Sequence, residues 1–589
     1  MAWYDEAVFY HIYPLGLTGA PKQNSYGEPE HRLREVFPWI EHIKKLGCNA
    51  IYIGPLFESV GHGYETTDYK KLDSRLGTNQ DLTDFVDECH QQGIKVILDG
   101  VFNHTGRDFF AFQDIKKNRE NSQYKDWYCN VNFWGNNEYN DGFSYENWGG
   151  YNLLVKLNQH NQAVKDYICD VIRFWVSEFD IDGIRLDAAD VLDFGYMQAL
   201  RHVANEVKPD FWLMGEVIHG DYNRWVNEGT LHSVTNYHLH KALYSGCNDH
   251  NFFEIAHTVK RLYGMGGNRP DGLKLYNFVD NHDVERIYTK LTNKAHYFPV
   301  HVMLYTLPGI PSIYYGSEFG IEGRKERGSD DSLRPALNYE EYKDAVENNA
   351  CTRLIAALGR IRQENPALSY GDYQEVVLTN RQYGYTRSYM GTTIAVSVNN
   401  DDNDAAMSLP VNGADAYVGA LSGQKVKVEN GRIHVTVQAN SGEIWIPEGN
   451  EQKKVNEPVF EDASPDFTRE VKESQKPAEM KDDSKPAEVK EGQKPAEVKD
   501  DSETVNMQSD ASSLEAVLKT DSDNVKEVLP IENRVVPVDK SYDEMTVEEL
   551  QAAIYQRMKQ NGPVTDQMKR DIEENVYHNS LVNWIKSFR

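Results

Sequence analysis

Eight short apolar segments alternate with amphipathic stretches over residues 1–365, and this alternation restricts the fold more than any other feature. Strands separated by helices form parallel β/α units, because a parallel strand pair needs a long crossover connection. Eight such units predict a closed (β/α)8 barrel of the TIM type. The predicted strands are 8–13, 50–54, 95–99, 182–187, 211–216, 233–236, 274–279 and 312–315.

Most segments between these strands have the periodicity of surface helices, as in 82–92 and 163–179. The segment 105–158 is the exception, because it is too long and too rich in aromatic and turn residues for an ordinary loop. We therefore predict a small domain inserted after the third strand.

Beyond residue 365 the apolar residues recur with period two, as in 393–398 and 432–437. Turn pairs such as Asn430-Gly431 separate these runs, which is typical of antiparallel strands. Residues 366–447 are therefore predicted to form a C-terminal antiparallel β sandwich.

Residues 448–545 are rich in Lys, Glu, Asp, Pro and Ser and contain three copies of a nine-residue unit, beginning at Lys476, Lys485 and Lys494. These units have few apolar side chains to bury, so we predict a largely disordered acidic linker. Residues 546–589 regain amphipathic periodicity behind a capping-box pattern at Thr546 and Glu549. They predict a helical hairpin that docks on the body of the same chain, on a protein partner or on a second copy of the chain.

Composition excludes several classes of partner. The net charge of −29 disfavours nucleic acid, because most of the surface would repel a polyanion. The sequence lacks a run of apolar residues long enough to cross a membrane. Asp5 and Glu6 stand where a secretory signal needs basic residues. The six cysteines show no CxxC spacing, so we expect reduced thiols and a cytoplasmic protein.

Polar residues follow four of the predicted strands. The C-terminal strand ends of a (β/α)8 barrel converge at one mouth, and charges placed there are costly unless a site uses them. Any one carboxylate could instead cap the helix that follows it, but four groups at different strand ends favour an active site. They are Asp99, Asn103 and His104 in VILDGVFNHTG, Arg185 and Asp187 in DIDGIRLDAAD, Glu216 in LMGEVIHG, and His282 and Asp283 in NFVDNHD.

These four segments resemble the conserved blocks of the α-amylase family of glycoside hydrolases. The resemblance extends to GHGYETTDY from Gly61, LVKLN from Leu154 and GIPSIYYGSEFG from Gly309, and it covers about the first 447 residues. It implies a catalytic barrel, a domain inserted after the third strand and a C-terminal sandwich, which is the order that the periodicity predicts.

The resemblance also implies the chemistry. Cleavage with retention needs a carboxylate that attacks the anomeric carbon and a carboxylic acid that protonates the departing oxygen. By resemblance Asp187 is the nucleophile, Glu216 the acid/base, and Asp283 the third carboxylate, which binds sugar hydroxyls. Arg185 lies two residues before Asp187, on the same strand face, and can hold that nucleophile ionised and oriented.

Five further residues match substrate-binding or supporting positions of the family: His62, Tyr64, Asp99, His104 and His282. Tyr64 would supply a ring for the apolar face of a sugar. The aromatic residues of the inserted segment either extend this platform or form the core of that small domain; they are Trp134, Tyr139, Tyr145 and Trp148. Asn103 matches a calcium ligand of many relatives, so bound Ca²⁺ is an expectation.

Two departures bear on the substrate. Ala188-Ala189-Asp190 follows Asp187 without the Lys-His pair of many α-amylases, and LVKLN is closer to the neopullulanase and cyclomaltodextrinase form. Those relatives typically have an extra N-terminal domain, whereas the first predicted strand here starts at Val8. We expect hydrolysis of α-1,4-glucosidic bonds in starch-derived glucans or maltodextrins, through a covalent glycosyl-enzyme intermediate.

Three alternatives remain at this stage. The first two, neopullulanase or cyclomaltodextrinase activity and transfer to a second sugar, use the same residues. The third is a non-catalytic binding subunit, and it is disfavoured because Asp187, Glu216 and Asp283 are all present.

The tail generates a first prediction. Ending the chain at Glu448 should leave the turnover of an α-glucan substrate unchanged, because a flexible tether holds no site geometry. The same truncation should abolish self-association or partner binding, measured by light scattering and pull-down. A truncated chain that associates as the full chain does would contradict the role of residues 546–589.

Overall fold

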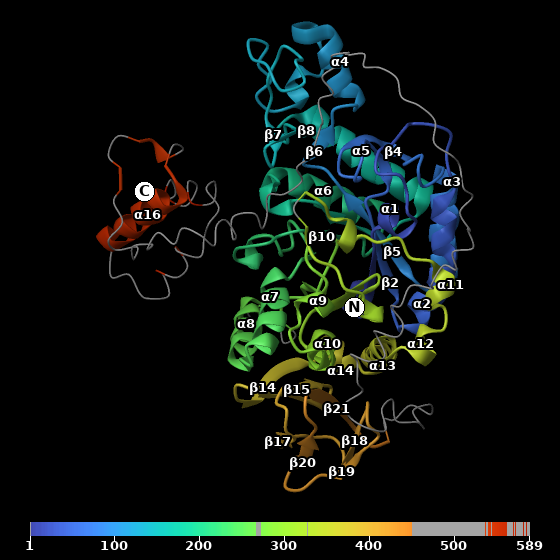
Figure 1. Cartoon of the computed structure of the whole chain (residues 1–589), viewed down its shortest axis with the longest axis vertical. Helices are drawn as coiled ribbons and strands as arrows, with labels where there is room; N and C mark the ends of the chain where they lie inside the picture. Colours follow the sequence, from blue (N-terminus) through green and yellow to red (C-terminus); the bar gives the residue numbers. More distant parts are fainter. Residues whose placement is uncertain are drawn as a thin grey trace, which may run out of the picture. The chain divides into compact units, whose positions relative to one another are not determined.

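The computed structural model describes residues 2–266, 272–326, 328–449, 536–537, 540–542 and 545–561, with Lys569, Ile572, Leu581 and Ile585. They form two compact units, and each is described by itself. The larger unit contains a barrel with an inserted domain on one side and a β sandwich on the other (Figure 1). The nine-residue repeats, almost all of the predicted linker and most of the second predicted tail helix lie outside the described residues.

Eight parallel strands form the barrel, in the order β11-β10-β9-β5-β2-β1-β13-β12. A parallel bridge between Thr235 and Tyr276 joins the two ends of this sheet, so the predicted barrel is confirmed. Most strands are shorter than predicted, while the last begins two residues earlier. The strands are β1 Phe9–Ile12, β2 Ala50–Ile53, β5 Lys95–Gly100, β9 Gly183–Leu186, β10 Trp212–Gly215, β11 Ser233–Val234, β12 Tyr276–Asn277 and β13 Ile310–Tyr314.

Helices surround the barrel because each has one apolar face to bury. In α5, the predicted face of Val164, Ile168, Val171, Ile172 and Trp175 is buried. The longer helices are α2 Phe37–Lys45, α3 Asn79–Gln91, α5 Gln162–Phe179, α6 Phe194–Val207, α7 Tyr237–Asn248, α8 Phe252–Met265, α10 Tyr297–Thr306 and α13 Ala350–Glu364. Shorter ones are α1 Pro14–Leu17, α9 Ile287–Lys290, α11 Tyr339–Tyr342, α12 Ala345–Asn348 and α14 Pro366–Tyr370.

The inserted domain contains helix α4 (Phe110–Asn118) and a three-stranded sheet, β6 His104–Gly106, β8 Tyr151–Lys156 and β7 Asn147–Trp148. Its aromatic residues differ in burial, and a role of the exposed ones in sugar binding stays a prediction. Tyr145 is buried in the core, 5.0 Å from the ring of Phe112, whereas Trp134 is 98% exposed. A hairpin of β3 (Phe57–Ser59) and β4 (Thr66–Leu72), which the strand pattern did not predict, carries His62 and Tyr64 in its turn.

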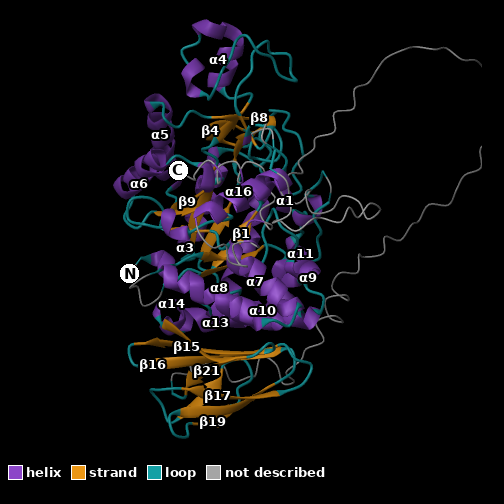
Figure 2. Cartoon of the chain, turned by 90° about the vertical axis from the view of Figure 1, so that its left-hand side faces the viewer, coloured by secondary structure: helices purple, strands orange, loops and turns teal. Residues whose placement is uncertain are grey.

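The predicted C-terminal sandwich is present, with its strands stacked beyond α10 and α13 (Figure 2). One sheet contains β14 Asp372–Leu378, β15 Gln382–Tyr389, β16 Thr392–Asn399, β21 Ser441–Pro447, β18 Ala416–Gly419 and β19 Lys425–Lys427. The other pairs β17 Ala405–Pro410 with β20 Arg432–Val437. The predicted turn at Asn430-Gly431 has positive φ at both residues, 53° and 72°, as tight hairpins require.

The C-terminal unit contains α16 (Val547–Asn561). Its capping box is formed, since the Thr546 backbone N–H donates to Glu549 Oε2 over 2.7 Å and the Glu549 N–H donates to Thr546 Oγ1. Leu550 and Ile554 pack with Ile572 and Leu581 of the same unit. Binding of a partner by this unit stays a prediction. Among the residues that the structure describes, no helix is long and apolar enough to cross a membrane.

Trp175 generates the prediction for the fold. Its ring stacks on Phe57 at 4.4 Å and its Nε1–H donates to the Tyr69 carbonyl over 2.7 Å, which joins α5 to the β3–β4 hairpin. Trp175→Ala should cost about 3–5 kcal/mol and lower Tm in a calorimetric scan. Trp134→Ala removes an exposed ring of the same size and serves as the control. Equal Tm values for the two variants would contradict this role.

Candidate active site

Four carboxylates lie at one rim of the barrel. Asp99 is the penultimate residue of β5, Asp187 and Glu216 directly follow β9 and β10, and Asp283 lies in the segment after β12. Parallel strands bring their C-terminal ends to the same rim, so residues distant in sequence meet there.

Arg185 is the centre of this rim and is buried on β9. Its Nη1 donates to Oδ1 of Asp99 and to Oδ1 of Asp187, each over 2.9 Å. Its Nη2 lies 3.0 Å from Oε2 of Glu216, which also accepts from the Ala188 backbone N–H. The predicted contact between Arg185 and Asp187 is therefore present, and one guanidinium binds three carboxylates.

Three carboxylates around one cation favour the uptake of a proton, because like charges in a buried site repel. Burial raises the pKa of Asp187 well above its ordinary value; the charges of Glu216 and Asp99 act in the same direction and that of Arg185 opposes them. The surroundings of Asp187 thus favour its protonated form more than water does. Glycosidic cleavage would use a proton from Glu216, with Asp187 ionised.

Tyr64 and His282 connect this cluster to Asp283. The Tyr64 hydroxyl donates to Oδ2 of Asp99 over 3.1 Å and lies 2.5 Å from Nε2 of His282. The same Nε2 lies 3.1 Å from Oδ2 of Asp283. The Tyr64 ring stacks on the His282 ring at 5.7 Å. The structure thus brings these four predicted residues together.

Tyr237 and Asn281, which were not among the predicted residues, connect Asp283 back to Glu216 by hydrogen bonds. Asn281 accepts from the Asp283 backbone N–H over 2.8 Å and donates through Nδ2 to the Tyr237 hydroxyl over 3.1 Å. That hydroxyl donates to Oε1 of Glu216 over 3.4 Å. We call the closed chain of hydrogen bonds the carboxylate ring; its members are Arg185, Asp99, Tyr64, His282, Asp283, Asn281, Tyr237 and Glu216. Asn281 lies inside the NFVDNHD block, and Tyr237 follows a barrel strand, so position alone could have indicated both.

Arg334 is a further residue that the sequence did not reveal. Its Nη2 lies 2.9 Å from Oδ1 of Asp283, and its guanidinium lies 4.7 Å from the centre of the Tyr13 ring. Burial alone would raise the pKa of Asp283, but the charges of His282 and Arg334 outweigh it and lower that pKa well below its ordinary value. Asp283 is therefore ionised, and its binding of sugar hydroxyls stays a prediction.

Two predicted histidines lie outside the carboxylate ring. His104 is buried, with Nδ1 3.2 Å from Nδ2 of Asn103. Burial, followed by the charge of His62, lowers the pKa of His104 to about 3, so it is neutral. His62 lies at the rim, 3.2 Å from Oε1 of Glu65 through Nε2, with its ring 5.7 Å from that of Tyr64. His62 and His104 lie beside the carboxylate ring, and their part in sugar binding stays a prediction.

Comparison with known proteins identifies the family. The family model of the alpha amylase catalytic domain matches residues 23–367, more than half of the chain. The chain belongs to the α-amylase family of glycoside hydrolases. A cyclomaltodextrinase from Bacillus sp is 31% identical over 424 residues, 68% of this chain and 74% of the relative. A maltogenic alpha-amylase from Bacillus acidopullulyticus is 31% identical over 470 residues, which cover 75% of this chain and 77% of the relative. A solved cyclomaltodextrinase structure has a TM-score of 0.66 at 27% identity, and the match covers 75% of this chain and 78% of that structure's chain.

Asn103, the expected calcium ligand, makes a side-chain hydrogen bond to Gln159, and bound calcium stays a prediction. Oδ1 of Asn103 accepts from Nε2 of Gln159 over 3.0 Å, and Oε1 of Gln159 accepts from the Asp193 backbone N–H over 2.6 Å. Nowhere in the described chain do three or more His, Cys, Asp or Glu side chains gather as a metal site. The Gln159 amide thus connects the loop after β5 to the segment after Asp187, and no catalytic step is assigned to calcium.

Gln159 provides the prediction for this site. Gln159→Ala removes two hydrogen bonds in a buried position, so we expect a loss of about 2 kcal/mol and a lower Tm. Excess EDTA should leave the Tm of the unmodified chain unchanged. Gln162→Ala, at an exposed position of α5, is the matched control. A Tm that falls with EDTA and recovers with Ca²⁺ would show that the ion, rather than Gln159, stabilises this junction.

Proposed function

We propose that this member of the α-amylase family hydrolyses α-1,4-glucosidic bonds in maltodextrins and cyclodextrins with retention of configuration. One observation carries the proposal: Asp187 and Glu216 bind the same guanidinium, and Asp283 closes the same ring of hydrogen bonds. A nucleophile, an acid and a hydroxyl-binding carboxylate around one space are the groups that this reaction needs.

In the first step Glu216 donates its proton to the glycosidic oxygen while Asp187 attacks the anomeric carbon. The carbon–oxygen bond breaks, the leaving sugar departs with the proton, and the remaining sugar is esterified to Asp187. In the second step Glu216 removes a proton from water, whose oxygen attacks the anomeric carbon and releases Asp187. Arg185 supports both carboxylates, because charge-assisted hydrogen bonds hold their orientation through both steps.

The names of the relatives support small α-glucans as substrates. The matched proteins are a cyclomaltodextrinase and a maltogenic alpha-amylase. In addition, this chain has Asp190 and Val191 where many α-amylases have a Lys-His pair, and Val191 is 40% exposed at the rim. The turn after Asp187 therefore presents an acidic and an apolar side chain to the rim in place of that pair.

Product analysis tests the proposal. Wild-type chain, Asp187→Asn and Glu216→Gln are incubated with maltoheptaose, β-cyclodextrin and pullulan, and products are separated by chromatography. We expect wild type to shorten maltoheptaose and open β-cyclodextrin, and each variant to be slower by about a thousandfold or more. Asp166→Asn, at an exposed position of α5, is the control.

Three outcomes would contradict parts of the proposal. Products longer than maltoheptaose would favour transfer to a second sugar, and cleavage confined to pullulan would favour another linkage. A folded Asp187→Asn or Glu216→Gln variant with nearly wild-type turnover would remove the assigned roles.

Asp190 provides a prediction on pH. It lies in the turn Ala189–Val191 after the nucleophile, and desolvation by surrounding atoms, followed by the charge of Glu216, raises its pKa to about 6. Above that pH Asp190 adds a negative charge to the rim, which favours retention of the catalytic proton. Asp190→Asn should therefore shift the alkaline limb of the kcat/KM profile downward by roughly 0.5 pH unit. The control Asp166→Asn should leave the alkaline limb of the kcat/KM profile unchanged. An unchanged or upward-shifted limb in Asp190→Asn would exclude this electrostatic influence.

We also propose a cytoplasmic location. No disulfide joins the six cysteines, all of which the structure describes, and four of them are buried, which suits a reducing compartment. Fractionation of cells that express the full-length chain tests this location, and recovery of the protein from the culture medium would contradict it.

A further inference from the structure

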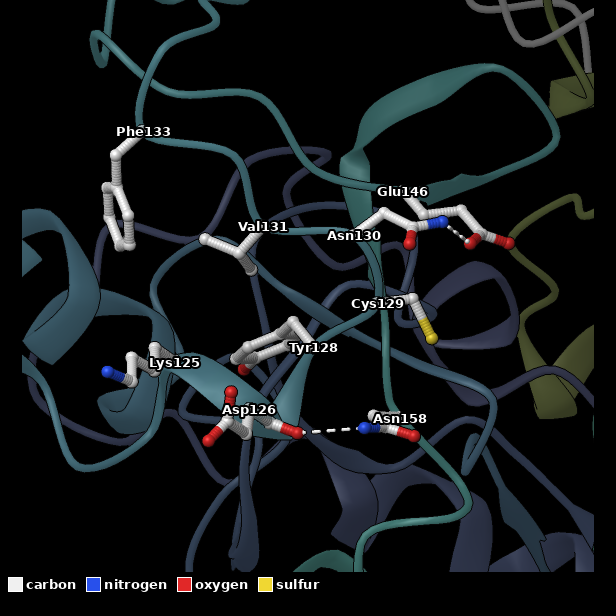
Figure 3. A pocket seen from close by; sticks show the side chains of 9 residues that line it. All are labelled: Lys125, Asp126, Tyr128, Cys129, Asn130, Val131, Phe133, Glu146 and Asn158. Atoms are coloured by element: carbon white, nitrogen blue, oxygen red, sulfur yellow. Dashed lines mark hydrogen bonds between the residues drawn. The ribbon is translucent and has the colours of Figure 1, made fainter. Parts of the chain in front are cut away.

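A cavity of about 420 Å³ lies in the inserted domain, apart from the carboxylate ring (Figure 3). One wall is the segment 125–133, and the other contains Glu146, just before β7, and Asn158, just after β8. No member of the carboxylate ring lines it. Its volume lies at the lower end of the range of small-ligand pockets, roughly 300–1,000 Å³.

The polar side chains of the cavity are held in place at one end. Oε2 of Glu146 accepts from Nδ2 of Asn130 over 2.8 Å, and Oε1 of Glu146 pairs with Lys156. Nδ2 of Asn158 donates to the Asp126 carbonyl over 3.0 Å. Figure 3 shows these two bonded pairs on either side of Cys129. Planar amides and carboxylates held in this way keep further lone pairs available for hydroxyl groups.

Phe133 supplies an apolar surface beside these groups. It is half-buried, and its ring is supported by the Arg119 guanidinium at 5.3 Å and by the Phe143 ring at 5.7 Å. A ring supported in this way can lie against an apolar face of a ligand at little cost in conformational entropy.

The charges of the cavity indicate a neutral ligand. The lining carries the carboxylates of Asp126 and Glu146 and the ammonium of Lys125, and Lys156 neutralises Glu146 from outside the lining. The remaining charges of Asp126 and Lys125 cancel, so the cavity has no excess charge to attract an anion or a cation. Fixed planar polar groups beside an aromatic ring, without net charge, suit a sugar.

We infer that this cavity is a second α-glucan-binding site, separate from the carboxylate ring, which holds one end of a glucan chain on the inserted domain. The inference rests on the proposed function for the choice of α-glucan among sugars. A backbone hydrogen bond of 3.0 Å from the Leu157 N–H to the Asn103 carbonyl connects the wall at Asn158 to the loop of His104. A chain bound here is therefore held on the same rigid part of the molecule as the catalytic rim.

Cys129 provides a direct probe, because its thiol is half-buried in this cavity. Cys169 is also half-buried but lies on α5, where its thiol faces the Ala199 carbonyl of α6, and it serves as an internal control. The other four cysteines are buried. Burial, followed by the charge of Glu146, raises the pKa of the Cys129 thiol, so alkylation is carried out at alkaline pH.

The experiment uses the full-length chain with Asp187→Asn, so that the glucan is not consumed. Iodoacetamide labelling of Cys129 and Cys169 is followed by mass spectrometry with and without maltoheptaose. At ten times the dissociation constant, maltoheptaose should slow the labelling of Cys129 about tenfold and leave Cys169 unchanged. Adding Phe133→Ala or Asn130→Ala should weaken this protection.

Three results would overturn the inference. The first is an unchanged rate at Cys129 when the catalytic rim is saturated with maltoheptaose. The second is equal protection with and without Phe133→Ala and Asn130→Ala, which would assign the effect to the catalytic rim. The third is protection by inorganic phosphate alone, which would assign the cavity to an anion. Hydrolysis by the wild-type chain is measured separately, so failure of the second site is distinguishable from failure of the proposed function.

Discussion

The rim of the barrel depends on the guanidinium of Arg185. Asp99, Asp187 and Glu216 come from three neighbouring strands, and without a cation between them their charges would repel in a buried site. Arginine suits this position because its planar group donates in several directions while remaining charged. The same contacts that make the cluster tolerable also orient Asp187 and Glu216, the proposed nucleophile and acid, so the stability of the rim and the proposed chemistry depend on one side chain.

Much of the fold could be predicted because the physical signals are periodic. The strand segments were located by apolar runs between helical stretches, and β20 was predicted with its observed bounds because its residues alternate strictly. The end of β12 was placed too far out because Phe278 and Val279 stay apolar after the chain leaves the sheet. The end of β11 was placed at Asn236, whereas only the bridge of Thr235 continues its pairing beyond Val234. The β3–β4 hairpin was missed because its pairing is irregular, with register shifts on both sides of Glu58.

The residues of the site also differ in how far the sequence could predict them. Asp187, Glu216 and Asp283 follow barrel strands, and the closed sheet brings them together, so their meeting could be predicted. Arg334 could not be, because it reaches Asp283 from a segment between β13 and α13 that shows no periodicity. The environment of Asn103 was also beyond the sequence: a matching residue type does not reveal that the neighbouring Gln159 already occupies its oxygen.

The barrel closes through its two shortest strands, β11 and β12, which are joined by one bridge and by the hydrogen bond from Asn236 Nδ2 to Asn277 Oδ1. Tyr237 follows β11 on one side of this seam, and Asn281 follows β12 on the other. The Tyr237 hydroxyl that contacts Glu216 therefore lies where the barrel strands are shortest. Arg185, by contrast, projects from a strand paired on both flanks. Local opening of this seam would therefore remove the Tyr237 contact from Glu216 before it affects the contacts that Arg185 makes with the carboxylates.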